Sequence, residues 1–150
     1  MTPTIRPATE SDADAIAPLF DQYRQFYGRR PQLERAHEFI RERLEHAESV
    51  ILVAEDAGKI LGFVQLFPSF TSLETERLWV LNDLYVSPEG RGRGLGRALM
   101  NAAREHAVKT GAKRLTLETM DDNRVAWSLY ESLGYKRNNP EIRFYTLEVD

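Results

Sequence analysis

The chain has 150 residues, 42% hydrophobic and 29% charged, a balance typical of one globular domain with its own core. Its net charge of −3 argues against general nucleic-acid binding, and its lack of cysteine excludes disulfides, thiol nucleophiles and cysteine metal sites. The acidic N-terminal region is unlike a signal peptide, and the apolar runs are too short to span a bilayer. We therefore expect a cytoplasmic protein that makes no contact with membrane.

The first half of the chain is patterned as a strand, two helices and a hairpin. Apolar residues recur at helical spacing after Ser11 and again after Pro31, and Gly28 separates the two helices. Two β-prone runs flank a short polar turn, and Pro68 is expected to end the second run. These elements are predicted at residues 4–8, 11–27, 31–44, 50–55 and 60–67.

The second half is patterned as strands alternating with helices. The predicted elements are a strand at 78–86, a helix at 94–110, a strand at 114–119, a helix at 121–133, and strands at 135–136 and 142–149. The whole order is β-α-α-β-β-β-α-β-α-β-β. It predicts one α/β domain with a mixed sheet over residues 1–150.

The most informative stretch joins the strand at 78–86 to the following helix and has the sequence LYVSPEGRGRGLGRAL over residues 84–99. A β-prone run ends at Pro88, a glycine-rich loop follows, and a helix-forming segment begins at once. Glycines allow positive φ and close approach of an anion, and the unpaired N–H groups of a helix start point the same way. The loop therefore predicts a phosphate or pyrophosphate site, with Arg91, Arg93 and Arg97 adding positive charge.

Two familiar phosphate loops do not fit this stretch. The nucleoside-triphosphate loop requires Lys and then Ser or Thr after its last glycine, but Arg97 and Ala98 follow Gly96. The dinucleotide fingerprint requires G-x-G-x-x-G, whereas these glycines alternate strictly. The spacing Arg91-x-x-Gly94-x-Gly96 after Leu-Tyr-Val-Ser-Pro resembles the coenzyme A pyrophosphate loop of the GNAT superfamily of N-acyltransferases. A flexible basic turn is the plain alternative.

A second motif supports the resemblance. Asn123-x-x-Ala126-x-x-Leu129-Tyr130-x-x-Leu133-Gly134-Tyr135 is similar to the last helix of that family. The resemblance is specific over residues 78–135, and only topological before them. The run FPSF at 67–70, together with RLWVLNDL at 77–84, looks like members described as histone- or polyamine-acetyltransferase-like.

The resemblance implies how acetyl-CoA binds as co-substrate. The open edge of Leu84, Tyr85 and Val86 would pair with the pantetheine amides as an added strand does, and an N–H near Leu84 or Val86 could polarise the thioester carbonyl. Asn123 and Ala126 on the last helix would also contact the coenzyme. The pyrophosphate would be bound by the backbone N–H groups of Arg91, Gly92, Arg93, Gly94, Leu95, Gly96 and Arg97.

The resemblance also implies catalytic roles. Tyr130 lies seven residues after Asn123, almost two helical turns at about 3.6 residues per turn, so both project from one face. Tyr130 would protonate the leaving coenzyme sulfur. The plain alternative is that Tyr130 is an aromatic residue of the core. Glu118 matches a position that some relatives use as the base. Asp83 is the rival, and both carboxylates could instead be solvated strand residues. A water chain would need no dedicated base.

The expected function is transfer of an acetyl group from acetyl-CoA to a primary amine of a small molecule, peptide or protein, within a ternary complex. A non-catalytic acyl-CoA-binding or sensing module is the alternative, and a basic interaction domain is the weakest one. The three histidines lack ligand spacing, so no metal site is expected. Relatives commonly form homodimers through their C-terminal strands, which residues 142–147 could provide here.

Overall fold

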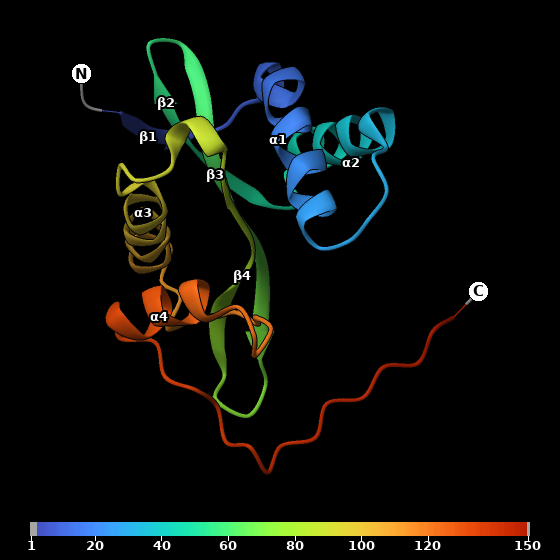
Figure 1. Cartoon of the computed structure of the whole chain (residues 1–150). Helices are drawn as coiled ribbons and strands as arrows, with labels where there is room; N and C mark the ends of the chain where they lie inside the picture. Colours follow the sequence, from blue (N-terminus) through green and yellow to red (C-terminus); the bar gives the residue numbers. More distant parts are fainter. Residues whose placement is uncertain (1–2, 150) are drawn as a thin grey trace. The chain divides into compact units, whose positions relative to one another are not determined.

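The computed structural model describes residues 3–149 and forms two compact units, one ending at Glu118 and the other beginning at Thr119 (Figure 1). The second unit contains α4 (Arg124–Ser132) and an extended segment after it. Short 3₁₀ turns lie at Glu10–Asp12 and Pro88–Gly90. The first unit contains β1 (Thr4–Pro7), α1 (Ala13–Phe26), α2 (Leu33–Glu45), β2 (Val50–Asp56), β3 (Lys59–Thr71), β4 (Glu76–Val86), α3 (Leu95–Lys109) and β5 (Arg114–Thr116).

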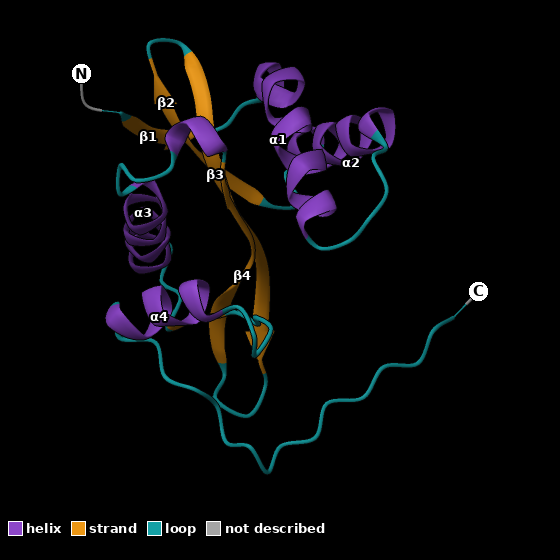
Figure 2. Ribbon diagram, in the orientation of Figure 1, coloured by secondary structure: helices purple, strands orange, loops and turns teal. Residues whose placement is uncertain are grey.

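The first unit is built on a five-stranded sheet in the order β1-β2-β3-β4-β5. The first four strands pair antiparallel, and β5 pairs parallel to β4, which confirms the predicted mixed sheet. Figure 2 shows α1 and α2 on one side of this sheet and α3 on the other. The core of the α1–α2 side includes Ile16, Phe20, Ile40, Val53 and Phe63, all buried.

Small residues bring α3 and β4 close to β3. A Cβ on Gly62 of β3 would lie 2.9 Å from the Tyr85 carbonyl oxygen and 3.4 Å from Leu99 Cδ1 of α3. Since real Cβ atoms do not approach backbone this closely, only glycine fits there. On α3 itself, Ala103 and Ala107 are buried, as its alanine-rich pattern predicts.

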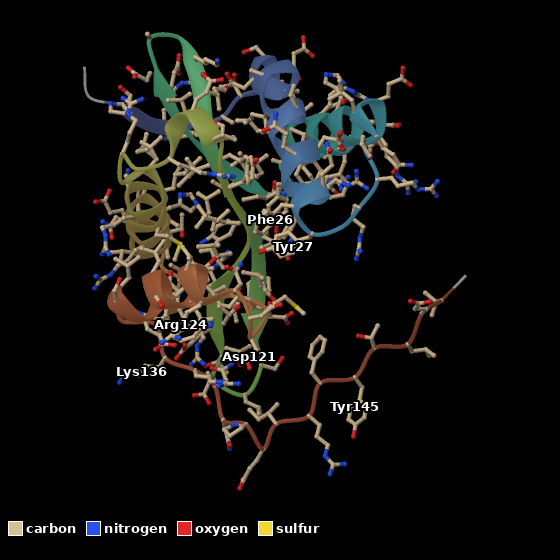
Figure 3. All side chains as sticks on the ribbon, in the orientation of Figure 1. Phe26, Tyr27, Asp121, Arg124, Lys136 and Tyr145 are labelled. Carbon is tan, nitrogen blue, oxygen red and sulfur yellow. The ribbon has the colours of Figure 1, made fainter. Side chains whose placement is uncertain are left out.

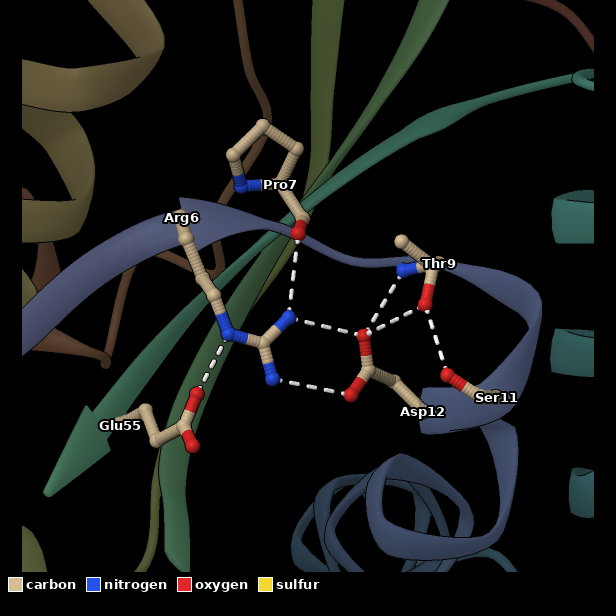
Figure 4. A network of polar contacts seen from close by, with 6 residues as sticks. All are labelled: Arg6, Pro7, Thr9, Ser11, Asp12 and Glu55. Carbon is tan, nitrogen blue, oxygen red and sulfur yellow. Dashed lines mark hydrogen bonds and ion pairs between the residues drawn. The ribbon is translucent and has the colours of Figure 1, made fainter. Parts of the chain in front are cut away.

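A charged network fixes the start of the chain (Figure 4). The Arg6 guanidinium donates two hydrogen bonds of 2.9 Å to the Asp12 carboxylate and another to Glu55 of β2. Asp12 also accepts the Thr9 N–H at 2.7 Å. The hydrogen bonds from Arg6 hold the pKa of Asp12 at about 2, well below its ordinary value of 3.8. The network thereby joins β1 and β2 to the turn that leads into α1.

Three strand predictions are wrong, the first of which concerns the end of β3. Pro68 does not end β3, which continues to Thr71, where it pairs with β4. Because β2 begins at Val50, opposite Leu66, the part of β3 after Leu66 has no neighbour on that side, and proline is tolerated on such an edge.

The strands predicted at 135–136 and 142–149 are absent from the structure, which assigns no strand to residues 133–149 (Figure 2). A strand requires a neighbour for its N–H and C=O groups, and this segment pairs with none of the described strands. Its apolar side chains from Ile142 onward are exposed, including Tyr145 at 79%, which projects from the extended chain (Figure 3). Among residues 3–149, the structure has no helix with the length and apolar character needed to cross a bilayer.

Candidate active site

A bulge interrupts β4 in the middle of the sheet. Gln65 of β3 pairs with Asp83, but the next residue, Leu66, pairs with Leu81, so Asn82 is an extra residue in β4. The Tyr23 hydroxyl of α1 donates to the Asn82 carbonyl oxygen at 3.3 Å. Bulges of this kind re-aim side chains and bend a strand, and they are common beside active sites.

The same strand has an open edge after the bulge. β5 pairs with β4 only from Leu78 to Val80, so within the described chain no strand lies beside the rest of β4 on that edge. The Ser87 N–H donates to the Leu61 carbonyl of β3 at 2.8 Å. Because N–H groups alternate sides along an antiparallel strand, those of Leu84 and Val86 point toward the open edge. These are two of the three residues predicted to pair with pantetheine, and the two whose N–H groups were predicted to polarise the thioester carbonyl.

The glycine loop follows directly at the end of this edge. Gly92 and Gly94 have φ values of +78° and +73°, a left-handed conformation that other residues adopt only at a cost. Gly94 is the N-cap of α3, so the first-turn N–H groups, starting with Leu95, have no intrahelical acceptor. Nothing lies within 4 Å of a Cβ built on Gly92 or Gly94. This space, bordered by N–H groups at the positive end of a helix dipole, suits a pyrophosphate.

The arginines of the loop are partly engaged by the protein. Arg93 forms an ion pair with Asp56 of the β2–β3 hairpin at 2.8 Å. The Arg91 Nε donates to the Val86 carbonyl oxygen at 3.1 Å, and its guanidinium lies 5.7 Å from the centre of the Tyr85 ring. The loop therefore presents mainly backbone N–H groups, and the charge of its arginine side chains is partly neutralised or engaged within the protein.

Aromatic side chains cover the face of β4 that is turned toward α1. The Tyr23 ring lies 6.2 Å from that of Tyr85 and 6.1 Å from that of Phe63, so it extends over the strands close to the bulge. Phe26 and Tyr27, at the end of α1, are 64% and 41% exposed (Figure 3). These rings form an apolar surface on the α1 side.

The predicted residues of the last helix belong to the second unit. Asn123 is the N-cap of α4, and its side-chain oxygen accepts the Ala126 N–H at 3.4 Å. The Tyr130 ring, half-buried, lies 6.2 Å from that of Tyr135. The N–H groups of Gly134 and Tyr135 return to the carbonyls of Glu131 and Tyr130, so Gly134 ends the helix as predicted. Glu118, the last residue of the first unit, is exposed.

A hollow of about 850 Å³ lies along α2. Its lining runs from Gln32 to Arg43 and includes Phe39, with the Arg43 guanidinium 4.3 Å from the Phe39 ring centre. None of the residues predicted for the site lines it. The features that match the predicted chemistry are instead the open β4 edge and the glycine loop.

Sequence reasoning missed two residues at the bulge. Gln65 is completely buried and contacts Asp83, and Ser49, before β2, contacts Gln65. The signal in the sequence that could have identified Gln65 is that it is the one polar side chain in the apolar run ILGFVQLF at 60–67. A buried amide must have hydrogen-bond partners, so this glutamine indicates polar partners elsewhere in the chain.

Comparison with known proteins agrees with this geometry. The profile of the Acetyltransferase (GNAT) family matches residues 15–135, most of the chain. The protein described as uncharacterized N-acetyltransferase YhfO of Bacillus subtilis is 49% identical over 140 residues, covering 93% of this chain and 94% of that one. A probable acetyltransferase of Haemophilus influenzae is 33% identical over 143 residues, covering 95% of each.

Solved structures agree as well. The crystal structure of a probable acetyltransferase has a TM-score of 0.90, with 41% identity and 98% of both chains covered. A ribosomal-protein-alanine N-acetyltransferase from Brucella melitensis, 21% identical, shares the fold with a TM-score of 0.83 over 99% of this chain and 100% of that one. The chain belongs to the GNAT family and is an acetyl-CoA-dependent N-acetyltransferase.

Proposed function

We propose that the protein transfers an acetyl group from acetyl-CoA to a primary amine of a small molecule, peptide or protein, by direct attack in a ternary complex. The observation that carries this proposal is the open β4 edge, with the N–H groups of Leu84 and Val86 leading to the glycine loop at the start of α3. The loop would hold the pyrophosphate, and the edge would hold the pantetheine arm. An edge N–H would stabilise the negative charge that develops on the carbonyl oxygen.

Acetyl transfer forms one bond to the carbonyl carbon and breaks another. The neutral amine nitrogen attacks the thioester carbon, the new C–N bond forms, and the C–S bond breaks. The amine loses its proton to a base, for which Glu118, Asp83 and water are the candidates. The leaving thiolate takes a proton, and Tyr130 is our candidate for the donor. Asn123 and Ala126 would contact the coenzyme from α4.

Initial-rate kinetics test the ternary complex. With acetyl-CoA varied at several fixed amine concentrations, direct attack predicts double-reciprocal lines that intersect. Parallel lines would instead indicate an acetylated enzyme and contradict the proposal. Coenzyme binding without thiol release, across a panel of spermidine, tyramine, lysine and an alanine-terminated peptide, would favour an acyl-CoA-binding module.

The variant Tyr130→Phe tests whether Tyr130 donates the proton to the leaving thiolate. Removing a positioned proton donor should lower kcat by roughly 10²–10⁴-fold, while the Kd for acetyl-CoA stays within about twofold. Tyr145→Phe is the matched control, since Tyr145 is 79% exposed in the same unit and should leave both constants unchanged. An unchanged kcat in Tyr130→Phe would remove Tyr130 from the mechanism.

Three further expectations remain proposals. We infer that both compact units form one acetyltransferase domain, which is supported by the family match across the junction at Glu118 and Thr119. We also infer a homodimer, supported by the exposed apolar side chains between Ile142 and Val149. A cytoplasmic location is supported by the lack of cysteine.

A further inference from the structure

A chain of polar side chains runs through the apolar interior to the β4 bulge. The Ser49 hydroxyl donates to Gln65 Oε1 at 2.7 Å, and Gln65 Nε2 donates to Asp83 Oδ2 at 2.8 Å. The Asn82 side chain donates to the other carboxylate oxygen of Asp83 at 3.1 Å. Gln65 is fully buried, and Ser49 and Asp83 are 9% and 6% exposed.

The donors in this chain can be arranged in only one way. An ionised carboxylate can only accept hydrogen bonds, so Gln65 must turn its NH₂ group toward Asp83. Its oxygen then faces Ser49, whose hydroxyl supplies a donor. The Asp83 carboxylate thus sets the orientation of the Gln65 amide, Ser49 satisfies the amide oxygen, and the amide in turn holds the Asp83 carboxylate in place.

Asp83 lacks a cationic partner. Among the ion pairs of residues 3–149, none includes Asp83. Buried carboxylates are normally paired with a positive charge, and an ionised carboxylate offers about four acceptor positions. The two hydrogen bonds described above leave acceptor capacity for a further donor.

The location of this carboxylate matches the place where an acceptor should lie. Asp83 directly precedes Leu84, the first residue with its N–H on the open edge. Strand alternation puts the side chains of Asp83 and Tyr85 on the same face, the one covered by α1 and its aromatic side chains. A positively charged amine that entered from the α1 side would therefore meet the carboxylate next to the strand that holds the thioester.

We propose that Gln65 is a positioning residue of the acetyl-transfer site, and that its buried amide holds the Asp83 carboxylate ready to receive the ammonium group of a cationic acceptor amine. The inference rests on the proposed function and adds to it a buried residue that positions the Asp83 carboxylate. Ser49 acts through Gln65.

Steady-state kinetics of thiol release test this inference, with whichever of spermidine, tyramine, lysine and an alanine-terminated peptide gives the highest kcat/KM. Gln65→Met keeps a similar volume but cannot donate to Asp83. It should raise the KM for the amine by about tenfold or more, while the Kd for acetyl-CoA stays within about twofold. Ser49→Ala should have a smaller effect in the same direction. In the Gln65→Met background Ser49→Ala should have none, because the two residues act in series.

Val64→Ala is the matched control. Val64 is adjacent to Gln65 on β3 and equally buried, but its side chain faces the opposite side of the sheet. Its loss should lower stability without changing the ratio of amine KM to coenzyme Kd. If Val64→Ala raises the amine KM as Gln65→Met does, or if neither Gln65→Met nor Ser49→Ala changes it, the positioning role is wrong.

The two proposals fail in different ways. A wild-type protein that binds acetyl-CoA but acetylates none of the four amines overturns the proposed function, and the role of Gln65 falls with it. A wild-type protein that acetylates amines, but whose Gln65→Met variant differs only in stability, overturns the positioning role alone. Should Gln65→Met not fold, Ser49→Ala by itself decides, since it removes only one hydroxyl.

Discussion

Replacing Gly94 by valine should weaken acetyl-CoA binding, whereas the same change at Gly111 should not. The two glycines lie at opposite ends of α3, with φ values of +73° and +78°. Nothing lies within 4 Å of a Cβ built on either one, so the cost of substitution is conformational in both cases. A side chain in this conformation costs roughly 1–2 kcal/mol, which predicts a Tm lower by about 2–8 °C in either variant.

The effects on binding should differ because only Gly94 is the N-cap of α3. A valine there favours a rotation of the backbone out of the left-handed conformation, which turns the loop N–H groups away from the anion. A hydrogen bond to a charged group contributes about 1.5–3 kcal/mol, so losing one should raise the Kd for acetyl-CoA by roughly 10–150-fold. Gly111 follows the C-terminal end of the helix, and its variant should bind within about twofold of wild type.

Isothermal titration with acetyl-CoA at fixed ionic strength, together with thermal unfolding of the same samples, measures both quantities. Thermal unfolding shows whether the two variants are matched in stability. An equal loss of affinity in the two variants would mean that the effect is global. A Gly94→Val protein with lowered Tm but wild-type affinity would show that the helix start does not hold the coenzyme. Either result would refute the reasoning.

Two other predictions concern charge. Asp12 has a pKa of about 2 in the folded chain against an ordinary 3.8, so the stability it contributes is present above about pH 4 and lost as the pH falls toward 2. After allowance for solvent around Arg6, the Asp12 carboxylate contributes about 1–2 kcal/mol to the free energy of unfolding. Urea unfolding measures this: between pH 5 and 2.5 the free energy of unfolding of Asp12→Asn should fall by about 1–2 kcal/mol less than that of wild type. Equal falls in the two proteins would contradict the prediction. Asp56→Asn should release Arg93 from its ion pair and lower the Kd for acetyl-CoA a few-fold at low salt, and this gain in affinity should disappear near 1 M salt. Glu45→Gln, which removes an exposed carboxylate of α2, is the control. The same gain in affinity in Glu45→Gln would contradict a local effect of Arg93.

Local signals in the sequence located the glycine loop and the helix after it correctly. The helix predicted at 94–110 is α3, and its end glycines adopt the positive φ expected of caps. These features depend on residues within a few positions of one another, so one chain segment contains the whole signal. The Asn123 cap and the Gly134 terminator of α4 were predictable for the same reason.

Features that depend on strand pairing were not predictable. The bulge at Asn82 is a property of the register between β3 and β4, and no local pattern specifies which residue is left over. The contact of Ser49 with Gln65 likewise joins residues brought together only by the pairing of β2 with β3. Apolar alternation after Ile142 looked like a strand, but a strand forms only where a partner exists.

The most direct test of the coenzyme site is a ¹⁵N–¹H NMR titration of the labelled wild-type protein with acetyl-CoA. The account predicts that the largest shifts fall on the backbone amides of residues 92–97 and on those of Leu84 and Val86. Shifts concentrated elsewhere, such as along the hollow beside Phe39 on α2, with the loop amides unchanged, would contradict it.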